Sequence, residues 1–278
     1  MFDREVLTIN LKGFLMNLEI PKVMGILNVT PDSFYSGSRV NHKAAIAERV
    51  AGMIEDGADI IDVGGCSTRP GFSLPTEEEE WERVDMGCET IRGISSEIPI
   101  SVDTFRASVA SKAIDKWDIE IINDISGGEQ PEIWELASAR NIPYVLTHNR
   151  HDGDTSYKDV TAEVITELSL KLNELHRLGV NDVIIDPGFG FAKNLSQNFQ
   201  LLEELNEIAR MGYPVLVGLS RKSMIYKTIE GEPENALTGT VALDAIALEK
   251  GAHILRVHDV KEAKETVKLF SVMKNLTI

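Results

Sequence analysis

The stretch IIDVGG (residues 60–65) is a short, β-branched apolar run that ends in two glycines. Similar runs occur at 23–27, 98–102, 119–122, 142–146, 183–185, 215–217 and 254–257, and each is followed by Gly, Pro, Asn, Asp, Ser or His. Such runs predict strands that are buried on both faces of a parallel sheet. Charged segments with helical spacing lie between them, at 43–55, 77–96, 107–116, 131–139, 160–178, 196–211, 236–249 and 260–274.

Eight alternating strand and helix units predict an α/β fold, a (β/α)₈ TIM barrel, over residues 22–278. A doubly wound open sheet is the alternative, although such sheets usually contain fewer units. Residues 1–21 fall outside the alternation. We expect them to form an N-terminal extension packed on the barrel, a β-hairpin that closes its lower end.

The composition limits the classes of partner. The chain has 278 residues with 44 acidic and 28 basic side chains, a net charge of −16. This charge argues against nucleic acid, whose phosphates are bound by Lys and Arg. Two cysteines without a CxxC pair argue against disulfides and structural zinc. The sequence has neither a signal peptide nor an apolar run of ~18 residues, so we expect a cytoplasmic protein with no membrane partner.

Polar residues follow the apolar runs, and in a closed barrel these positions converge on the rim that carries catalysis. A single Asp or Asn after a strand is usually a helix cap or turn residue, but a whole set predicts an active site. Asp103, Asn123 and Asp186 would suit a flat heterocycle with donors and acceptors on its edge. The residues that follow the apolar runs are, in order, Asn28, Gly64, Gly65, Asp103, Asn123, Asp124, His148, Asp186, Ser220, Arg221, Lys222, Arg256 and His258.

Four further segments predict anion binding and lids. The loop at 64–72 carries Arg69 among small residues, and the loop at 28–34 ends in an aromatic residue, so both are interpreted as lids. Residues 220–223 (SRKS) place Arg221, Lys222 and Ser223 at a helix start after the seventh strand, where barrels often bind phosphate or carboxylate. Arg256 and His258 share one face of the last strand, and this pairing favours diphosphate binding over a histidine that only packs in the core.

Seven ordered motifs identify a resemblance over residues 22–275. They are GILNVTPDSF (25–34), DVGGCSTRPG (62–71), SVDT (101–104), INDISGG (122–128), DPGFGF (186–191), SRKS (220–223) and RVHDV (256–260). Together they resemble the dihydropteroate synthase family of folate biosynthesis, the target of sulfonamides. The resemblance implies a transferase that joins 6-hydroxymethyl-7,8-dihydropterin diphosphate to p-aminobenzoate with Mg²⁺ present, releasing pyrophosphate by a dissociative mechanism. It also implies a homodimer formed through helices late in the barrel.

The resemblance also implies roles for individual residues. Catalysis would fall to Asp103, Lys222 and Arg256. The pterin would be bound by Asp103, Asn123, Thr147, Asp186, Phe191, Lys222 and Arg256. The diphosphate would be bound by Asn28, Thr68, Arg69, Arg256 and His258, with Mg²⁺ at Asn28. The p-aminobenzoate would be bound by Phe34, Thr68, Pro70 and Ser223.

Some positions depart from the family pattern, and three other functions stay open. Cys66 replaces a common acid, Tyr35-Ser36 replaces Ser-Asp, Thr147 stands where methionine is common, and Tyr226 stands where glycine is frequent. The alternatives are a non-catalytic pterin-binding paralogue, a pterin-binding methyltransferase domain, and an aldolase that uses Lys222 as a Schiff-base nucleophile.

Overall fold

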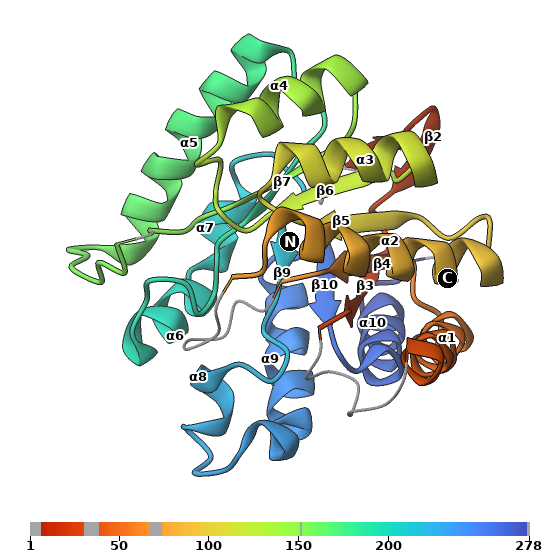
Figure 1. Ribbon diagram of the computed structural model, residues 1–278. Helices are drawn as coiled ribbons and strands as arrows, with labels where there is room; N and C mark the ends of the chain where they lie inside the picture. Colours follow the sequence, from red (N-terminus) through yellow and green to blue (C-terminus); the bar gives the residue numbers. More distant parts are fainter. Residues whose placement is uncertain (1–6, 31–38, 67–73, 151, 277–278) are drawn as a thin grey trace.

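A computed structural model of the chain describes residues 7–30, 39–66, 74–150 and 152–276. The strands are β1 (Thr8–Leu11), β2 (Phe14–Asn17), β3 (Lys22–Asn28), β4 (Ile60–Gly64), β5 (Ile100–Asp103), β6 (Ile121–Asp124), β7 (Tyr144–Thr147), β8 (Val183–Asp186), β9 (Leu216–Val217) and β10 (Ile254–Val257). The helices are α1 (Arg39–Glu55), α2 (Glu77–Ile94), α3 (Ala107–Trp117), α4 (Pro131–Arg140), α5 (Val160–Leu178), α6 (Leu195–Glu203), α7 (Leu205–Ala209), α8 (Ser223–Tyr226), α9 (Leu237–Glu249) and α10 (Val260–Met273), with a 3₁₀ turn at Pro233–Asn235. Figure 1 shows the helices arranged around the strands. Among the helices described, none is both long and apolar enough to span a membrane.

The strands from β3 to β10 form one parallel sheet that closes on itself. Their order is β8-β7-β6-β5-β4-β3-β10-β9, so β3 to β8 follow the order of the sequence, and the last strand, β10, pairs with the first strand of the sheet, β3. A parallel bridge between Ile185 and Val215 joins the two edge strands. The fold is therefore a (β/α)₈ barrel, as predicted, and the open-sheet alternative is wrong.

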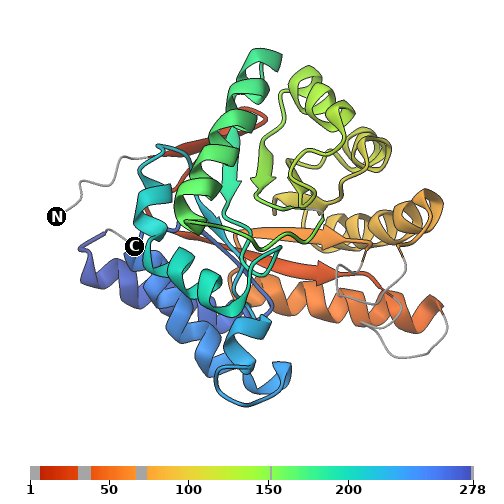
Figure 2. The same ribbon diagram turned by 90° about the vertical axis from the view of Figure 1, so that its left-hand side faces the viewer.

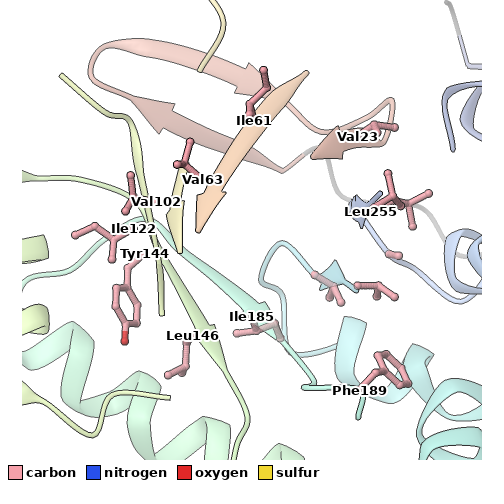
Figure 3. Packing of buried hydrophobic residues seen from close by; sticks show 14 of the residues in the cluster. Val23, Ile61, Val63, Val102, Ile122, Tyr144, Leu146, Ile185, Phe189 and Leu255 are labelled. Atoms are coloured by element: carbon pink, nitrogen blue, oxygen red, sulfur yellow. The ribbon is translucent and has the colours of Figure 1, made fainter. Parts of the chain in front are cut away.

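Alternation along each strand divides the core into two layers. Val63, Val102, Ile122 and Leu146 lie in the outer layer with apolar side chains from the helices, as Figure 3 shows for the strand residues. The inner layer fills the lower half of the barrel and consists of Met24, Ile60, Ile121, Val145, Ile184, Leu216 and Ile254. A barrel packed in this way has no pore, and polar chemistry is confined to its upper end.

The N-terminal residues form the predicted hairpin. β1 and β2 pair in antiparallel register from Thr8 opposite Asn17 to Leu11 opposite Phe14. Side chains of Ile9, Leu11 and Met16 are buried against the inner layer of the barrel. Figure 2 shows the hairpin at the end of the barrel where the strands begin. The hairpin therefore closes the lower end and leaves the upper end to the site.

Two groups of boundaries differ from the prediction. The predicted helix at 196–211 is divided into α6 and α7, because Glu204 has φ −100° and ψ 15° and interrupts the helix. The apolar runs ending at residues 102, 122 and 146 continue into β5, β6 and β7, whose last residues are polar. Asp103 pairs with Asn123 in the sheet, and Asn123 pairs with Val145. These polar residues are therefore held by the sheet rather than by loops.

Candidate active site

The inner face of the barrel changes from apolar to polar toward the upper end of the strands. Side chains two positions apart on a strand point to the same side, so the residue two places after an inner-layer residue also faces inward. These inward pairs are Ile60 and Asp62, Ile121 and Asn123, Val145 and Thr147, Ile184 and Asp186, and Ile254 and Arg256. Polar residues predicted at separate strand ends are thus brought together on one rim.

Arg256 lies at the centre of a hydrogen-bonded network on this rim. Its Nε donates to Asp62 Oδ2 at 2.7 Å, and its Nη2 donates to Asp103 Oδ2 at 2.7 Å. Asn123 Nδ2 donates to the same Asp62 oxygen at 3.0 Å. The guanidinium therefore bridges carboxylates from two neighbouring strands and fixes its own orientation.

Asp62 is a site residue that the sequence-based set omitted. Its side chain is fully buried, and its Oδ1 has no hydrogen-bond partner among the described residues. The sequence does contain a signal, because Asp62 interrupts a run of apolar residues on a strand buried along its whole length. An acid at such a position requires a positive or N–H partner.

Burial and charge set the protonation of this network. Burial raises the pKa of Asp103, Arg256 lowers it, and the carboxylates of Asp62 and Glu80 raise it further. Burial alone would lower the pKa of Arg256, but Asp62 and Asp103 together raise it. Arg256 is thus held in its charged form, while Asp103 is poised to gain a proton more readily than an exposed carboxyl.

A second group is formed by Asp186, Phe191 and Lys222. Lys222 Nζ donates to the carbonyl of Phe189 and lies 4.7 Å from the centre of the Phe191 ring. Burial lowers the pKa of Lys222 to about 8, although Asp186 acts to raise it. Burial raises the pKa of Asp186, which Lys222 opposes. Asp186 and Lys222 therefore offer an acceptor and a donor that interact electrostatically.

Two buried hydroxyls on the inner face of the strands are unsatisfied. Thr147 Oγ1 and Ser101 Oγ have no hydrogen-bond partner within the described part of the chain. Thr147 pairs in the sheet with Asp186, and Ser101 pairs with Asp62, so both flank the polar networks. Buried hydroxyls of this kind are normally satisfied by a ligand or by ordered water.

The described residues predicted for the diphosphate and for a carboxylate include Asn28 at the end of β3, His258 just after β10 and Ser223 at the start of α8. Asn28 ends β3, and its Oδ1 lies 3.3 Å from where a Cβ on Gly64 would be, so a larger residue at 64 would crowd it. The backbone N–H of His258 donates to Ser220 Oγ at 3.1 Å, and Arg49 donates to the His258 carbonyl. Burial lowers the pKa of His258 to about 4, with Arg256 acting in the same direction.

Arg221 does not act as the free anion donor that its place in SRKS predicts. It is paired with Asp259, with Nε to Oδ2 at 2.9 Å and Nη2 to Oδ1 at 2.8 Å. Its positive φ of 55° turns the chain just before Lys222 and Ser223, which begins α8. Arg221 therefore anchors this turn, leaving Lys222 to face the pocket.

Two other strand-end residues also lie away from the pocket. Asp124 accepts from Tyr144 Oη at 2.5 Å and from the Ser126 N–H at 2.7 Å. His148 Nε2 lies 2.8 Å from Glu167 Oε2 of α5. Both residues follow an inward-facing residue by one position, so alternation turns them toward the helices.

The two predicted lids cannot be placed, because Phe34, Thr68, Arg69 and Pro70 lie outside the described residues, as do Tyr35 and Ser36. Cys66 is the last described residue before the second loop. Burial raises the pKa of its thiol to about 12, and the nearby Glu80 adds to this effect. This thiol is therefore not activated as a nucleophile.

Comparison with known proteins assigns the family. A family model described as pterin binding enzyme matches residues 24–258. Dihydropteroate synthase from Escherichia coli strain K12 is 41% identical over 265 residues, which cover 93% of this chain and 93% of the relative. Dihydropteroate synthase from Bacillus subtilis is 40% identical, covering 91% of this chain and 88% of the relative.

Solved structures agree with the sequence relatives. Xanthomonas albilineans dihydropteroate synthase with 4-aminobenzoic acid superposes with a TM-score of 0.92 at 36% identity, covering 98% of this chain and 100% of that one. The Thermus thermophilus enzyme in complex with 6HMPPP gives a TM-score of 0.84 at 34% identity, covering 96% of this chain and 100% of that one. The barrel fold is thus shared with these structures along nearly their whole length. This chain belongs to the dihydropteroate synthase family of pterin binding enzymes.

Proposed function

We propose that this chain condenses 6-hydroxymethyl-7,8-dihydropterin diphosphate with p-aminobenzoate, giving 7,8-dihydropteroate and pyrophosphate. The observation that carries the proposal is the convergence of Asp103, Asn123, Asp186, Lys222 and Arg256 on one rim of the barrel. Arg256 bonds directly to Asp103 and is linked to Asn123 through Asp62, while Lys222 interacts electrostatically with Asp186 and lies beside the Phe191 ring. Relatives with the same fold are described in complex with 4-aminobenzoic acid and with 7,8-dihydropteroate.

The two polar groups fit the edge of a pterin. A pterin presents an amino group and ring N–H donors beside a carbonyl acceptor, so it needs carboxylates and a cation close together. Asp103 and Asp186 supply acceptors, Asn123 and Lys222 supply donors, and Thr147 adds a hydroxyl that has no described protein partner. Phe191 and the Arg256 guanidinium provide flat surfaces for the ring. A bound pterin would thus satisfy groups that are otherwise costly to bury.

The reaction needs stabilisation of charge more than a nucleophile from the protein. As the C–O bond to the diphosphate breaks, positive charge develops on the pterin methylene, and the Asp103 carboxylate stabilises it. Arg256 and His258, on the same face of the last strand, are proposed to bind the departing diphosphate. The aniline nitrogen of p-aminobenzoate then attacks the methylene and loses a proton to solvent or to the released pyrophosphate. Catalysis in this scheme rests on positioning and electrostatics.

We propose Mg²⁺ as the metal, held on the protein side by Asn28. Its amide oxygen is a hard ligand at the end of β3. Within the described ranges, no group of three or more His, Cys, Asp or Glu side chains is arranged to hold a metal. The donor set therefore fits Mg²⁺, which usually keeps several waters and takes further ligands from substrate phosphates. When bound, it would neutralise charge on the leaving diphosphate.

The p-aminobenzoate is assigned to the side of the pocket formed by α8. Ser223 begins this helix directly after Lys222, and its hydroxyl and backbone N–H are proposed to bind the carboxylate. Phe34, Thr68 and Pro70 are proposed to complete this site, with Arg69 and Thr68 closing over the diphosphate. This arrangement orders the two substrates along the rim, with the pterin methylene between them.

The test is formation of dihydropteroate in assays where each substrate and Mg²⁺ are omitted in turn. The proposal requires product only in the complete mixture, with one pyrophosphate released for each dihydropteroate. Pterin binding without product would indicate the non-catalytic paralogue. Borohydride trapping of a carbonyl substrate on Lys222 would indicate the aldolase.

We also propose that the chain forms a homodimer through the outer faces of α9 and α10. These helices pack against each other, and α9 is apolar on nearly every side. The apolar residues Ile246 of α9 and Leu269, Val272 and Met273 of α10 are exposed. Sedimentation velocity should give about twice the chain mass of 30.7 kDa, and Leu269→Glu should shift the population toward monomer. A wild-type monomer at micromolar concentration would contradict the proposal.

A further inference from the structure

The turn that follows β8 connects two pocket residues, Asp186 at the end of the strand and Phe191, and its backbone is held from several sides. Gly188 has φ +72°, and a Cβ there would lie 1.9 Å from the carbonyl oxygen of His148, so the turn packs directly against the end of β7. Asp186 Oδ1 accepts from the Gly188 N–H at 2.8 Å. Lys222 donates to the Phe189 carbonyl. The position of this turn therefore sets where Asp186 and Phe191 face the ligand.

Lys193 holds the same turn from behind. Its Nζ donates to the Gly188 carbonyl at 3.0 Å and to the Phe191 carbonyl at 3.1 Å, and it lies 3.0 Å from His148 Nδ1. Burial lowers the pKa of Lys193 to about 7, and in its protonated form the ammonium has three N–H donors, all of which these three acceptors use. Lys193 is only 8% exposed. A long cationic side chain buried with its donors fully used is a structural clamp rather than a solvated surface group.

The hydrogen bonds of Lys193 continue through His148 to Glu167 of α5. Because His148 Nδ1 accepts from Lys193, its Nε2 carries the proton and donates to Glu167 Oε2 at 2.8 Å. Glu167 is in turn held by Arg150, which also pairs with Glu163 at 2.8 Å. Burial lowers the pKa of His148, and the Lys193 charge acts in the same direction, so the imidazole stays neutral and remains an acceptor.

We infer that Lys193 is a positioning residue for the pterin site, which fixes residues 188–191 so that Asp186 and Phe191 are placed before the ligand arrives. The inference rests on the proposed function for the identity of the ligand. Lys193 itself makes no contact with the substrate in this account. Its removal should therefore weaken pterin binding while sparing p-aminobenzoate, which is assigned to α8.

The test compares Lys193→Met with Arg92→Met as a matched control. Arg92 is also a largely buried cation that donates to backbone carbonyls, those of Ile98 at 2.7 Å and Trp117 at 3.2 Å, but it does so at the lower end of the barrel. Lys193→Met is expected to raise the KM for the pterin diphosphate about tenfold or more, a loss equal to about one charged hydrogen bond. Its KM for p-aminobenzoate should stay within about twofold. Arg92→Met is expected to lower the melting temperature and leave both KM values within about twofold.

A second measurement, hydrogen exchange, does not depend on catalytic activity. Hydrogen exchange of the segment 186–194 is expected to be faster in Lys193→Met than in the wild type, and unchanged in Arg92→Met. An unchanged pterin KM, an equal rise for both substrates, or unchanged exchange in this segment would overturn the inference. If Lys193→Met does not fold, Lys193→Gln, which keeps two N–H donors on a shorter chain, should show the same pattern with about a threefold rise in the pterin KM. If the wild type forms no dihydropteroate, the proposed function fails, while the exchange comparison still decides whether Lys193 holds the turn.

Discussion

Arg256 and Asp62 are 194 positions apart in the sequence and are joined in the barrel by a hydrogen bond of 2.7 Å from Nε to Oδ2. Asp62 also accepts from Asn123, so one buried carboxylate orients two residues that are proposed to bind the pterin. The guanidinium then reaches Asp103 with a second nitrogen. The site is thus organised by a residue that need not contact the substrate.

Replacing Asp62 with Asn should impair both stability and pterin binding. The change keeps the shape of the side chain but removes the charge that pairs with Arg256, and hydrogen bonds to charged groups contribute about 1.5–3 kcal/mol. We expect urea unfolding to show a loss of about 2 kcal/mol and the pterin KM to rise at least tenfold. The exposed Asp115, which pairs with Arg140 at 2.7 Å, gives the control Asp115→Asn, whose loss should be below about 0.5 kcal/mol. Equal effects of the two variants would contradict the assigned role of Asp62.

Thr147→Val should separate ligand binding from stability. The hydroxyl is buried without a described partner, so its removal should leave the free energy of unfolding unchanged or raise it by up to about 1 kcal/mol. Pterin affinity, measured by calorimetry, should fall about threefold or more because the ligand loses a hydrogen bond. Thr161 of α5 has a similarly unsatisfied buried hydroxyl away from the pocket, so Thr161→Val should change stability in the same direction and leave affinity unaltered. The role of Thr147 is wrong if both variants bind the pterin as the wild type does.

Asp244→Asn should stabilise the protein at alkaline pH. Burial raises the pKa of Asp244 on α9 to about 8, and the charge of Asp259 adds to this. An unfolded Asp titrates near 3.9, so between about pH 4 and 8 the folded state retains a proton that the unfolded state has lost. Stability from this group therefore falls as pH rises through that window.

Asn carries no such proton, so the variant should melt at least about 2 °C above the wild type at pH 8 and close to it at pH 4. Scanning calorimetry at the two pH values measures the difference. If the difference in melting temperature between the variant and the wild type is the same at both pH values, Asp244 does not titrate as stated.

Ser223→Ala should act on the second substrate. The hydroxyl at the start of α8 is assigned to the carboxylate of p-aminobenzoate, and a hydrogen bond to a charged group is worth about 1.5–3 kcal/mol. We expect the KM for p-aminobenzoate to rise by about tenfold or more and the KM for the pterin diphosphate to stay within about twofold. Steady-state kinetics with each substrate varied in turn provide the measurement. A parallel rise of both KM values would place Ser223 elsewhere in the site.

The barrel was predictable because its signal is periodic and local, whereas the connections among site residues are not. Apolar runs such as 60–63 and 183–185 mark strands, and barrel closure then carries Asp103, Asn123 and Asp186 to one rim. Arg221 and His148 follow strands, which predicts that they face the pocket. Instead, Arg221 pairs with Asp259 and His148 is turned toward Glu167. Side-chain partners of this kind depend on tertiary packing and leave no spacing in the sequence.

Asp62 and Lys193 are two residues whose roles were not predicted from the sequence. Asp62 is visible as an acid within a buried strand, but its partner Arg256 is on another strand at the far end of the sequence. Lys193 resembles an ordinary lysine beside a helix start, and only the folded chain places it under the turn of Gly188. Burial of a charged side chain is the physical mark of both residues, and it emerges only with the fold.

The proposed activity and the catalytic use of the polar rim are tested most directly by the rate of dihydropteroate formation by the wild type and by Asp103→Asn, with both substrates and Mg²⁺ saturating. We predict turnover by the wild type with equal release of pyrophosphate, and a fall in kcat of about 100-fold or more in Asp103→Asn, because the developing cation loses its carboxylate. A wild type that binds the pterin but makes no dihydropteroate would contradict the proposed activity. An unchanged kcat in Asp103→Asn would contradict the proposed use of the polar rim.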